Sequence, residues 1–358
     1  MSEPFHILDD APGAWDALVR DDPGATPAHR PELWRMLADA LPGGRVAFIA
    51  VEDHGTLIGG AGVVIERRAG FRWIHAQPWL LTGAPLAQDG AHPLVDRAVA
   101  TGFHALMRDL ASVGGEWACY RPDGPEPAPE ALEIVPGTTS RVETAVVDLS
   151  RGLGSARARL GKRLRQYLRN ETRLLEFADE PDAVEEVYVL YARQARGWPG
   201  YAPLPLELSR RLLVQRGGAH EGREAAPLAR LFTLRDQGRL LAATLFLDHP
   251  RELFAWWSGI SPRARGRHVF PLLLWKAVEW AAMQGRARVN LGGSAGRASL
   301  IAFKEALGAE DRAFPVRWLS ARHATTAGRT IAALQAWRRR ARPRGVTSEA
   351  VESREGDA

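Results

Sequence analysis

The sequence predicts a mixed α/β fold in two domains, and three observations support this prediction. The chain has 358 residues, which exceeds the usual size of a single domain. Segments with helical apolar spacing alternate with short segments rich in Val, Ile and Phe. The turn signals Asp53-His54-Gly55 and Asp236-Gln237-Gly238 each join two strand candidates into a hairpin. We therefore expect each domain to hold a mixed, mostly antiparallel sheet flanked by helices.

The charge of the chain changes near residue 150. Residues 1–150 carry 11 basic and 21 acidic side chains, whereas residues 151–358 carry 36 and 21. The first half is therefore acidic and the second half basic, which predicts different partners, with an anion such as phosphate for the second. Arginine on solvated helices would give the same balance, because only three of the 47 basic residues are lysines, namely Lys162, Lys276 and Lys304.

Composition also excludes several classes of protein. No apolar run reaches the roughly 20 residues that a membrane span needs, and residues 1–10 do not resemble a signal peptide. The single cysteine, Cys119, cannot form an internal disulfide or a cysteine-based zinc site, and its apolar surroundings predict a buried core residue. We expect a cytoplasmic protein with no membrane span and no metal site.

The first half, residues 1–150, reads as short helices alternating with strands. The expected helices cover residues 14–18, 30–41 and 94–114, and the expected strands cover 45–52, 57–67, 71–75, 117–120 and 142–149. Residues 78–85 form a loop rich in Trp, Gly and Pro.

The second half is predicted to hold a domain over residues 151–323, a terminal helix over 324–342 and a disordered tail over 343–358. One basic helix is expected over residues 151–173, which contain eight basic residues and one acidic residue. Further helices are expected over 183–196, 206–216, 269–284 and 299–307, and strands over 228–235, 239–247, 253–260, 288–291 and 316–321.

The strongest local signal is a strand, a basic loop and a helix in succession. The strand Leu253–Ile260 leads into a loop that contains Arg263, Arg265 and Arg267, and an apolar helix begins at Val269. A helix N-terminus favours an anion, and arginines add charge-assisted hydrogen bonds. A pyrophosphate or phosphodiester is the natural occupant, and a solvated turn is the alternative.

This loop resembles the acetyl-CoA motif of the GNAT acyltransferase superfamily, in which an R-x-x-G-x-G/A loop holds a pyrophosphate. Arg263 and Gly266 match the arginine and the first glycine. His268 stands where the motif has Gly or Ala, and a side chain there crowds the close approach of a phosphate.

Residues 4 to 320 as a whole resemble the Fem-type branch, the FemX and FemAB-like enzymes with two GNAT-like domains. This resemblance implies tandem GNAT-like domains, the first degenerate and the second carrying the active site. It also implies the transfer of amino acids from aminoacyl-tRNA to peptidoglycan precursors. Five segments carry it, in family order: residues 78–86, 160–169, 270–275, 289–294 and 301–309.

The resemblance implies direct acyl transfer to an amine, with roles for particular residues. A backbone N–H near Trp257 and Ser258 would bind the acyl oxygen, and Lys304 would stabilise the oxyanion or hold an anionic group. A lysine on the solvent side of an amphipathic helix is the alternative for Lys304. The predicted donor-binding residues are Arg263, Arg265, Gly266, Arg267, His268, Trp257, Asn290 and Ser294.

Other segments are candidates for binding the acceptor or a tRNA. Trp198 and Tyr201 lie in an aromatic loop that could cover the acceptor or plug the space between domains. Lys162, Arg163 and Arg165 could contact tRNA or another anion, or form a solvated surface. Asp248 and His249 could accept a proton, although capping a hairpin is the simpler interpretation.

The sequence therefore predicts an acyltransferase with acyl-CoA or aminoacyl-tRNA as co-substrate and no tightly bound cofactor. The acceptor would be an amine-bearing small molecule or a peptidoglycan precursor. Two alternatives remain open at this point: a non-catalytic GNAT-like scaffold and a basic nucleic-acid-binding protein. The oligomeric state is not readable from the sequence.

Overall fold

The computed structural model describes residues 4–68, 70–76, 78–171, 175–198, 202–215, 227–264 and 267–320. The predicted terminal helix over 324–342 and the tail over 343–358 lie outside the described residues. Of the candidate site residues, Arg265, Gly266 and Tyr201 also lie outside them.

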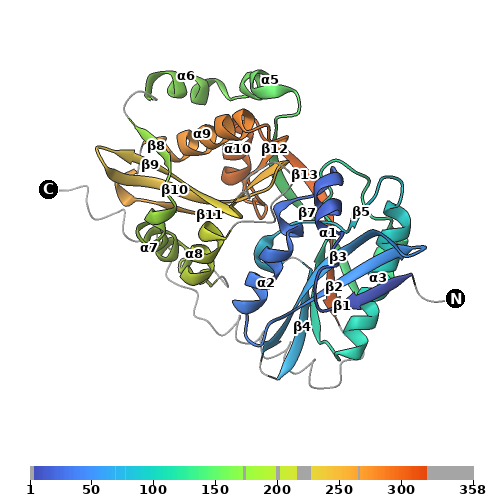
Figure 1. The fold of residues 1–358 in the computed structure, drawn as a ribbon. Coiled ribbons are helices and arrows are strands. Elements are labelled where there is room, and N and C mark those ends of the chain that lie inside the picture. Colours follow the sequence, from blue (N-terminus) through green and yellow to red (C-terminus); the bar gives the residue numbers. More distant parts are fainter. Residues whose placement is uncertain are drawn as a thin grey trace.

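The first half contains helices of 5 to 18 residues between the strands of one part of the sheet (Figure 1). The turn between the second and third strands has positive φ at His54 and Gly55, as a tight hairpin requires. The elements are β1 (Phe5–Leu8), α1 (Trp15–Asp21), α2 (Pro31–Asp39), β2 (Arg45–Asp53), β3 (Thr56–Arg68), β4 (Phe71–His75), β5 (Leu86–Ala87), α3 (His92–Asp109), β6 (Gly114–Ala118), α4 (Pro129–Glu133) and β7 (Gly137–Asp148).

The second half begins with helices and continues with an antiparallel strand group. Gln237 and Gly238 have positive φ in the predicted hairpin turn. The elements are α5 (Gly152–Ala158), α6 (Lys162–Glu171), β8 (Glu176–Asp179), α7 (Val184–Ala195), α8 (Leu206–Val214), β9 (Ala229–Asp236), β10 (Arg239–Asp248), β11 (Glu252–Ile260), α9 (Val269–Met283), β12 (Arg288–Asn290), α10 (Ala298–Ala306) and β13 (Glu310–Ser320).

The described strands form one continuous sheet across both halves. Its order is β1-β2-β3-β4-β6-β13-β7-β12-β11-β10-β9-β8, and β5 pairs with β3. The pairs β4–β6 and β11–β12 are parallel, and the other pairs are antiparallel. The predicted fold class is therefore confirmed. Since β13 pairs with both β6 and β7, the last described strand joins the sheet of the first half.

Helices cover both faces of the sheet. One apolar core contains buried residues of α1, α2, α7 and α8, so it extends across both halves on one face. On the other face, α3 covers the strands of the first half and α9 covers those of the second. Cys119 is fully buried in the α3 core, as predicted.

The prediction of a single basic helix over residues 151–173 is wrong. The segment forms two helices, α5 and α6, that are separated at Leu160 and Gly161. The Gly161 N–H donates to the Ala306 carbonyl of α10, and a Cβ at Gly161 would meet Ala306 at 3.4 Å. This long-range contact lies at the break between the two helices. The short strand β8 was also not predicted from the sequence.

A buried ion pair links the first residue of β11 to the first residue of β12. Glu252 and Arg288 are opposite each other in the parallel register, and the distance from Arg288 Nε to Glu252 Oε2 is 2.6 Å. Their side chains are 0% and 3% exposed. Arg288 also donates to the carbonyl of Ala25 and pairs with Asp123, both in the first half. The same guanidinium therefore joins two strands and the two halves of the chain.

Of the helices in the described ranges, none is long and apolar enough to cross a membrane.

We expect Arg288→Met to lower the free energy of unfolding by about 3–5 kcal/mol, because it leaves the Glu252 carboxylate buried without its cationic partner. Urea unfolding monitored by circular dichroism measures this loss. The matched control is Arg141→Met, which breaks an exposed pair with Glu126 and should cost less than about 1 kcal/mol. Equal losses in the two variants would contradict the role of the buried pair.

Candidate active site

The candidate site lies where β11 and β12 separate. The two strands pair over three residues each, the last pair being Phe254 with Asn290. The chain beyond Asn290 stays with β7, because the Leu291 N–H donates to the Ala145 carbonyl and the Ala145 N–H donates to the Gly292 carbonyl. β11 continues beyond Phe254 to Ile260, and on the side away from β10 these residues have no partner among the described strands.

The register of β11 shows which backbone groups face this open edge. The Ser261 N–H donates to β10 at 2.8 Å, and the orientation of N–H groups alternates along an antiparallel pair. The N–H groups of Ile260 and Ser258 therefore point away from β10, and that of Trp257 points toward it. The Ile260 N–H donates to Oε1 of Gln194 at 3.2 Å, which agrees with this orientation. The Ser258 N–H faces the space between β11 and β12.

A β-bulge in β11 brings the first half to the site. Trp256 is the extra residue, since its neighbours Ala255 and Trp257 face consecutive residues of β10. Its indole N–H donates to the carbonyl of Trp79 at 3.1 Å. Trp79 has a φ of 55° and lies in the loop over residues 78–86. The loop that resembles the Fem-type Pro-and-Gly segment therefore contacts the strand of the candidate site.

The indole of Trp257 lies in the core and not at the surface of the site. The side chain stacks on Tyr191 of α7, with ring centroids 4.5 Å apart and an interplanar angle of 24°. Trp257 is 3% exposed, and its indole nitrogen is buried without a hydrogen-bond partner among the described residues. The Ser258 hydroxyl lies 2.9 Å from that of Thr244 on β10.

The described basic side chains of the loop lie at the surface. Arg263, Arg267 and His268 are exposed, and the turn is folded by bonds from Ala264 N–H to the Ser261 carbonyl and from Arg267 N–H to the Ala264 carbonyl. Arg267 also forms an ion pair with Asp236 at 2.9 Å. The loop ends directly at the N-terminus of α9, where the helix dipole favours an anion.

His268 contacts the basic helix α6. Its ring centroid lies 4.9 Å from that of Tyr167, with an interplanar angle of 68°. Two residues further along, in the first turn of α9, Phe270 stacks on Phe303 of α10 with ring centroids 5.8 Å apart. The loop is thus flanked by α6 on one side and leads toward α10 through this aromatic pair.

Lys304 holds the glycine turn that follows β12. Its Nζ donates to the carbonyls of Gly292 and Gly293 at 2.7 and 2.9 Å. The residue is 5% exposed, and burial lowers the pKa of its ammonium group to about 8. The interpretation of Lys304 as a solvent-facing lysine is therefore wrong. Gly292 itself has a φ of 73°, which only glycine adopts readily.

Asn290 and Ser294 lie on either side of this turn and are both buried. The Asn290 carboxamide oxygen accepts from the Thr144 hydroxyl and the Gly292 N–H, and its nitrogen donates to Glu252. These bonds place Asn290 in the interior of the sheet. Ser294 is 1% exposed, and its hydroxyl has no hydrogen-bond partner among the described residues.

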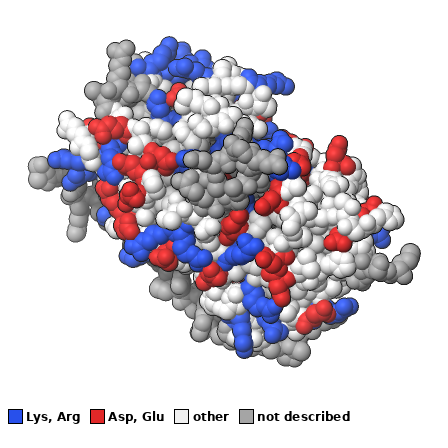
Figure 2. All heavy atoms as spheres, viewed as in Figure 1, with Lys and Arg blue, Asp and Glu red and all other residues white. Residues whose placement is uncertain are grey.

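The predicted tRNA-contact residues lie on the surface of α6. Lys162, Arg163 and Arg165 are exposed, and Arg165 donates to the carbonyls of Ala158 and Leu160. Figure 2 shows Lys and Arg side chains gathered over the α5–α6 region. Trp198, the predicted acceptor residue, follows α7, is 41% exposed and lies 6.5 Å from Tyr191 between ring centroids.

Asp248 and His249 lie at the other end of the β10–β11 hairpin. Asp248 is buried and paired with Arg230 and Arg286, each at 2.9 Å. His249 is buried, and desolvation lowers its pKa well below the ordinary range. His249 closes the hairpin turn, because it exchanges backbone hydrogen bonds with Glu252 and its Nδ1 accepts from the Arg251 N–H. The Asp248 carboxylate is instead taken up by the two arginines.

Sequence reasoning missed Gln194 and Tyr167 as residues of this region. Gln194 lies in the last turn of α7, and Tyr167 lies in α6 directly before the buried Leu168. Each contacts the site only through packing between segments that are far apart in the chain, so no local pattern identifies it.

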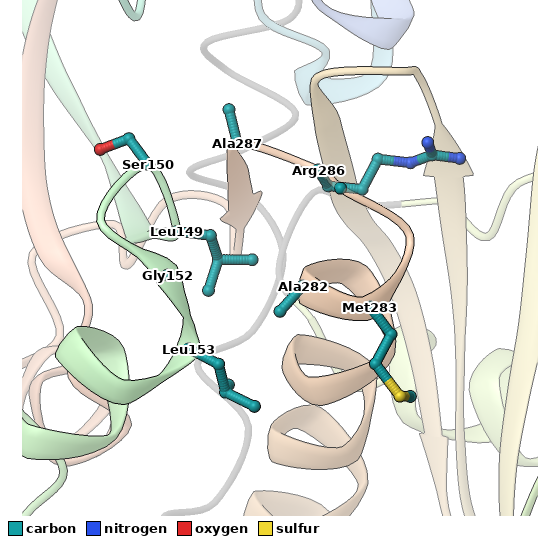
Figure 3. A pocket seen from close by; sticks show the side chains of 9 residues that line it. Leu149, Ser150, Gly152, Leu153, Ala282, Met283, Arg286 and Ala287 are labelled. Atoms are coloured by element: carbon teal, nitrogen blue, oxygen red, sulfur yellow. The ribbon is translucent and has the colours of Figure 1, made fainter.

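Two pockets of the described residues lie away from the site. One of about 470 Å³ separates residues 149–153 from the end of α9, with Leu149 and Leu153 directed toward the helix (Figure 3). It borders the start of β12, whereas the glycine turn follows its end. The second, of about 890 Å³, lies in the first half beside α1 and the loop at Asp123. Neither pocket is lined by a predicted site residue.

Comparison with known proteins identifies the class to which the second half belongs. Residues 154–311 match the family described as Acetyltransferase (GNAT) domain. This range includes β11, the basic loop, α9, the glycine turn and α10. The second half of the chain therefore carries a GNAT acetyltransferase domain, which confirms the resemblance identified in the sequence and supports an acyltransferase.

Solved structures extend the likeness of fold to nearly the whole chain. The structure titled as FemX has a TM-score of 0.65 at 10% identity and covers 92% of this chain and 99% of its own. The C-terminal domain of a putative lysylphosphatidylglycerol synthetase from Agrobacterium fabrum has a TM-score of 0.57 at 15% identity, with 90% and 95% coverage. These likenesses show that the fold is shared over nearly the whole chain. No curated protein matches the sequence.

We expect the stability that Lys304 confers to depend on pH. Its folded pKa of about 8 is below the ordinary 10.5, so the unfolded chain binds more protons between these values and stability rises with pH there. Between about pH 8 and pH 10.5, the free energy of unfolding of the wild-type protein should rise by about 3 kcal/mol relative to that of Lys304→Met. Urea unfolding at several pH values measures the difference.

Lys276→Met, which removes the lysine of α9, is the matched control for loss of a lysine. Parallel pH profiles for the unchanged protein and Lys304→Met would show that burial does not affect the titration of Lys304.

Proposed function

We propose that this acyltransferase passes an activated acyl or aminoacyl group directly from its donor to an amine. One observation carries the proposal: the Ser258 N–H faces the open edge of β11, and the same strand leads into the exposed basic loop. A donor whose anionic part lies at the loop can therefore extend along β11 with its acyl carbonyl at Ser258.

The transfer needs a bond exchange at one carbonyl carbon. The lone pair of a neutral amine forms the C–N bond while the C–S bond of a thioester or the C–O bond of an ester breaks. The amine proton leaves to the departing group or to water. Negative charge develops on the acyl oxygen in between, and the fixed Ser258 N–H donates to it at no cost of reorganisation.

Lys304 has a positioning role in this proposal. Its two bonds to carbonyls of the glycine turn fix the wall that faces β11. Because the lysine is buried, its charge acts at short range in a region of low dielectric constant. The sequence-based prediction that Lys304 also stabilises the oxyanion stays a prediction.

Donor and acceptor are assigned by the surfaces on either side of the reacting carbonyl. Arg263, Arg267 and His268 serve the anionic donor, either acyl-CoA or aminoacyl-tRNA. Trp198, together with the predicted Tyr201, serves the acceptor, an amine-bearing small molecule or a peptidoglycan precursor. Cytoplasmic location stays a prediction.

Separate incubations with CoA, acetyl-CoA and charged tRNA test the donor. A bound donor raises the melting temperature, because it stabilises the folded state by mass action. Consumption of the donor only when an amine is present demonstrates transfer. Binding without consumption for every donor and amine would favour the non-catalytic scaffold instead.

We expect an ester in place of the peptide amide at residue 258 to lower kcat by about 10²–10³, because it removes the N–H that binds the oxyanion. The α-hydroxy analogue of serine introduces this change. The matched control is the same replacement at Gly259, whose N–H points toward β10. The Gly259 variant should lose stability and keep its kcat. An unchanged kcat in the residue-258 ester would exclude the Ser258 N–H as the hydrogen-bond donor to the oxyanion.

A further inference from the structure

The exposed face of α6 carries positive charge that no carboxylate of the described residues offsets by an ion pair. Its exposed cations are Lys162, Arg163, Arg165 and Arg169. The sequence holds no acidic residue from 149 to 170. Elsewhere in the second half, exposed arginines such as Arg210 form ion pairs with glutamates. The face of α6 is therefore a cationic surface that the described part of the chain leaves open to a partner.

The arrangement of these cations lowers the stability of the helix itself. Lys162 and Arg163 begin α6, where the helix dipole favours acidic residues, and the first turn has none. Arg165 and Arg169 are four residues apart, so their like charges repel each other on one face of the helix. An anionic partner at this face would relieve both effects. The arrangement is therefore typical of a surface that meets negative charge.

The face offers a partner charge, and neither an exposed ring nor an exposed apolar side chain. Leu164 and Leu168 pack into the core, so they are not free to insert into a partner. Tyr167 is half-buried, and its ring contacts that of His268. Single-stranded nucleic acid is bound through rings on which its bases stack. The face of α6 instead fits a partner whose surface repeats negative charge.

The position of α6 favours a flat partner. α5 and α6 lie at the outer edge of the second half (Figure 1), and Lys and Arg side chains gather there in Figure 2. Arg165 donates to the carbonyls of Ala158 and Leu160, which ties the two helices together. The first half has 21 acidic and 11 basic side chains. A polyanion that wraps around the molecule would be repelled by this acidic half, whereas a flat anionic surface contacts the edge alone.

We propose that the exposed face of α6 binds the surface of a lipid bilayer with anionic headgroups, through charge alone and without insertion. The inference goes beyond the proposed function, because acyl transfer by itself needs no bilayer. Each Lys or Arg close to an anionic bilayer strengthens binding about fivefold. Four such residues therefore give a reversible association that salt weakens.

Sedimentation with vesicles tests the proposal. One set of vesicles consists of phosphatidylcholine, and in the other set phosphatidylglycerol replaces one third of it. We expect binding to the anionic vesicles only, with a loss of binding as salt is raised. The triple variant Lys162→Gln, Arg163→Gln and Arg169→Gln should bind these vesicles about a hundredfold more weakly, because it removes three of the cations.

The matched control removes the same charge from exposed arginines of the first half. It is the triple variant Arg45→Gln, Arg97→Gln and Arg108→Gln, which should bind anionic vesicles as the wild-type protein does. Equal loss of binding in the two triple variants would overturn the proposal, because net charge and not the α6 face would then decide. Binding of the wild-type protein to neutral vesicles would overturn it as well.

Two further measurements separate a bilayer from other partners and from a role in folding. Arg163→Lys combined with Arg169→Lys should keep vesicle binding, because a bilayer responds to charge and not to the guanidinium fork. Loss of binding in that variant would overturn the proposal. An α6 triple variant that loses binding to an RNA duplex and keeps binding to vesicles assigns the face to RNA instead. The melting temperature of the α6 triple variant should not fall, and a fall would show that these cations serve the fold.

Discussion

The pairing of Glu252 with Arg288 is the constraint on which the geometry of the site depends. These residues begin β11 and β12 and are opposite each other in the register, so the ion pair holds the two strands together at one end. Three residues later the strands separate, and the space between them is the candidate site. Burial of both charges makes the junction intolerant of losing either partner. Because Arg288 also contacts Ala25 and Asp123, the orientation of the first half is fixed at the same point.

The first half contributes to the site although it lacks the basic loop. Its loop over residues 78–86 reaches the bulge of β11, where the Trp79 carbonyl accepts from Trp256. The central strands also connect the two halves, since β13 pairs with both β6 and β7. The parallel pairs β4–β6 and β11–β12 give each half the same strand arrangement, but only the second is followed by a cationic loop and helix. The acidic first half therefore acts as a scaffold that positions the bulge.

Much of the local structure of the site was predictable from the sequence, because it is built from neighbouring residues. The strand over 253–260, the basic loop, the apolar helix from Val269 and the glycine turn are all visible as patterns of spacing and composition. The break between α5 and α6 was not predictable, since Gly161 becomes a helix end only through its bond to Ala306. The partners of Lys304 and the capping of Ile260 by Gln194 likewise depend on packing between separate segments. Only the strand register shows whether the N–H of Trp257 or that of Ser258 faces the open edge, where it could bind the acyl oxygen.

The separation of the strands gives a neutral backbone the part that it plays in the proposed reaction. A strand N–H is normally used by its neighbour, and β11 has one such neighbour, β10, along its whole length. The departure of β12 toward β7 leaves alternate N–H groups on the other edge of β11 without a partner among the described strands. Gln194 satisfies the group at Ile260, so the protein closes the edge immediately before the basic loop. What remains is a fixed donor at Ser258, set between a cationic surface and a turn held by Lys304. In the proposed function, the same divergence that removes a strand pair provides a preorganised position for developing negative charge.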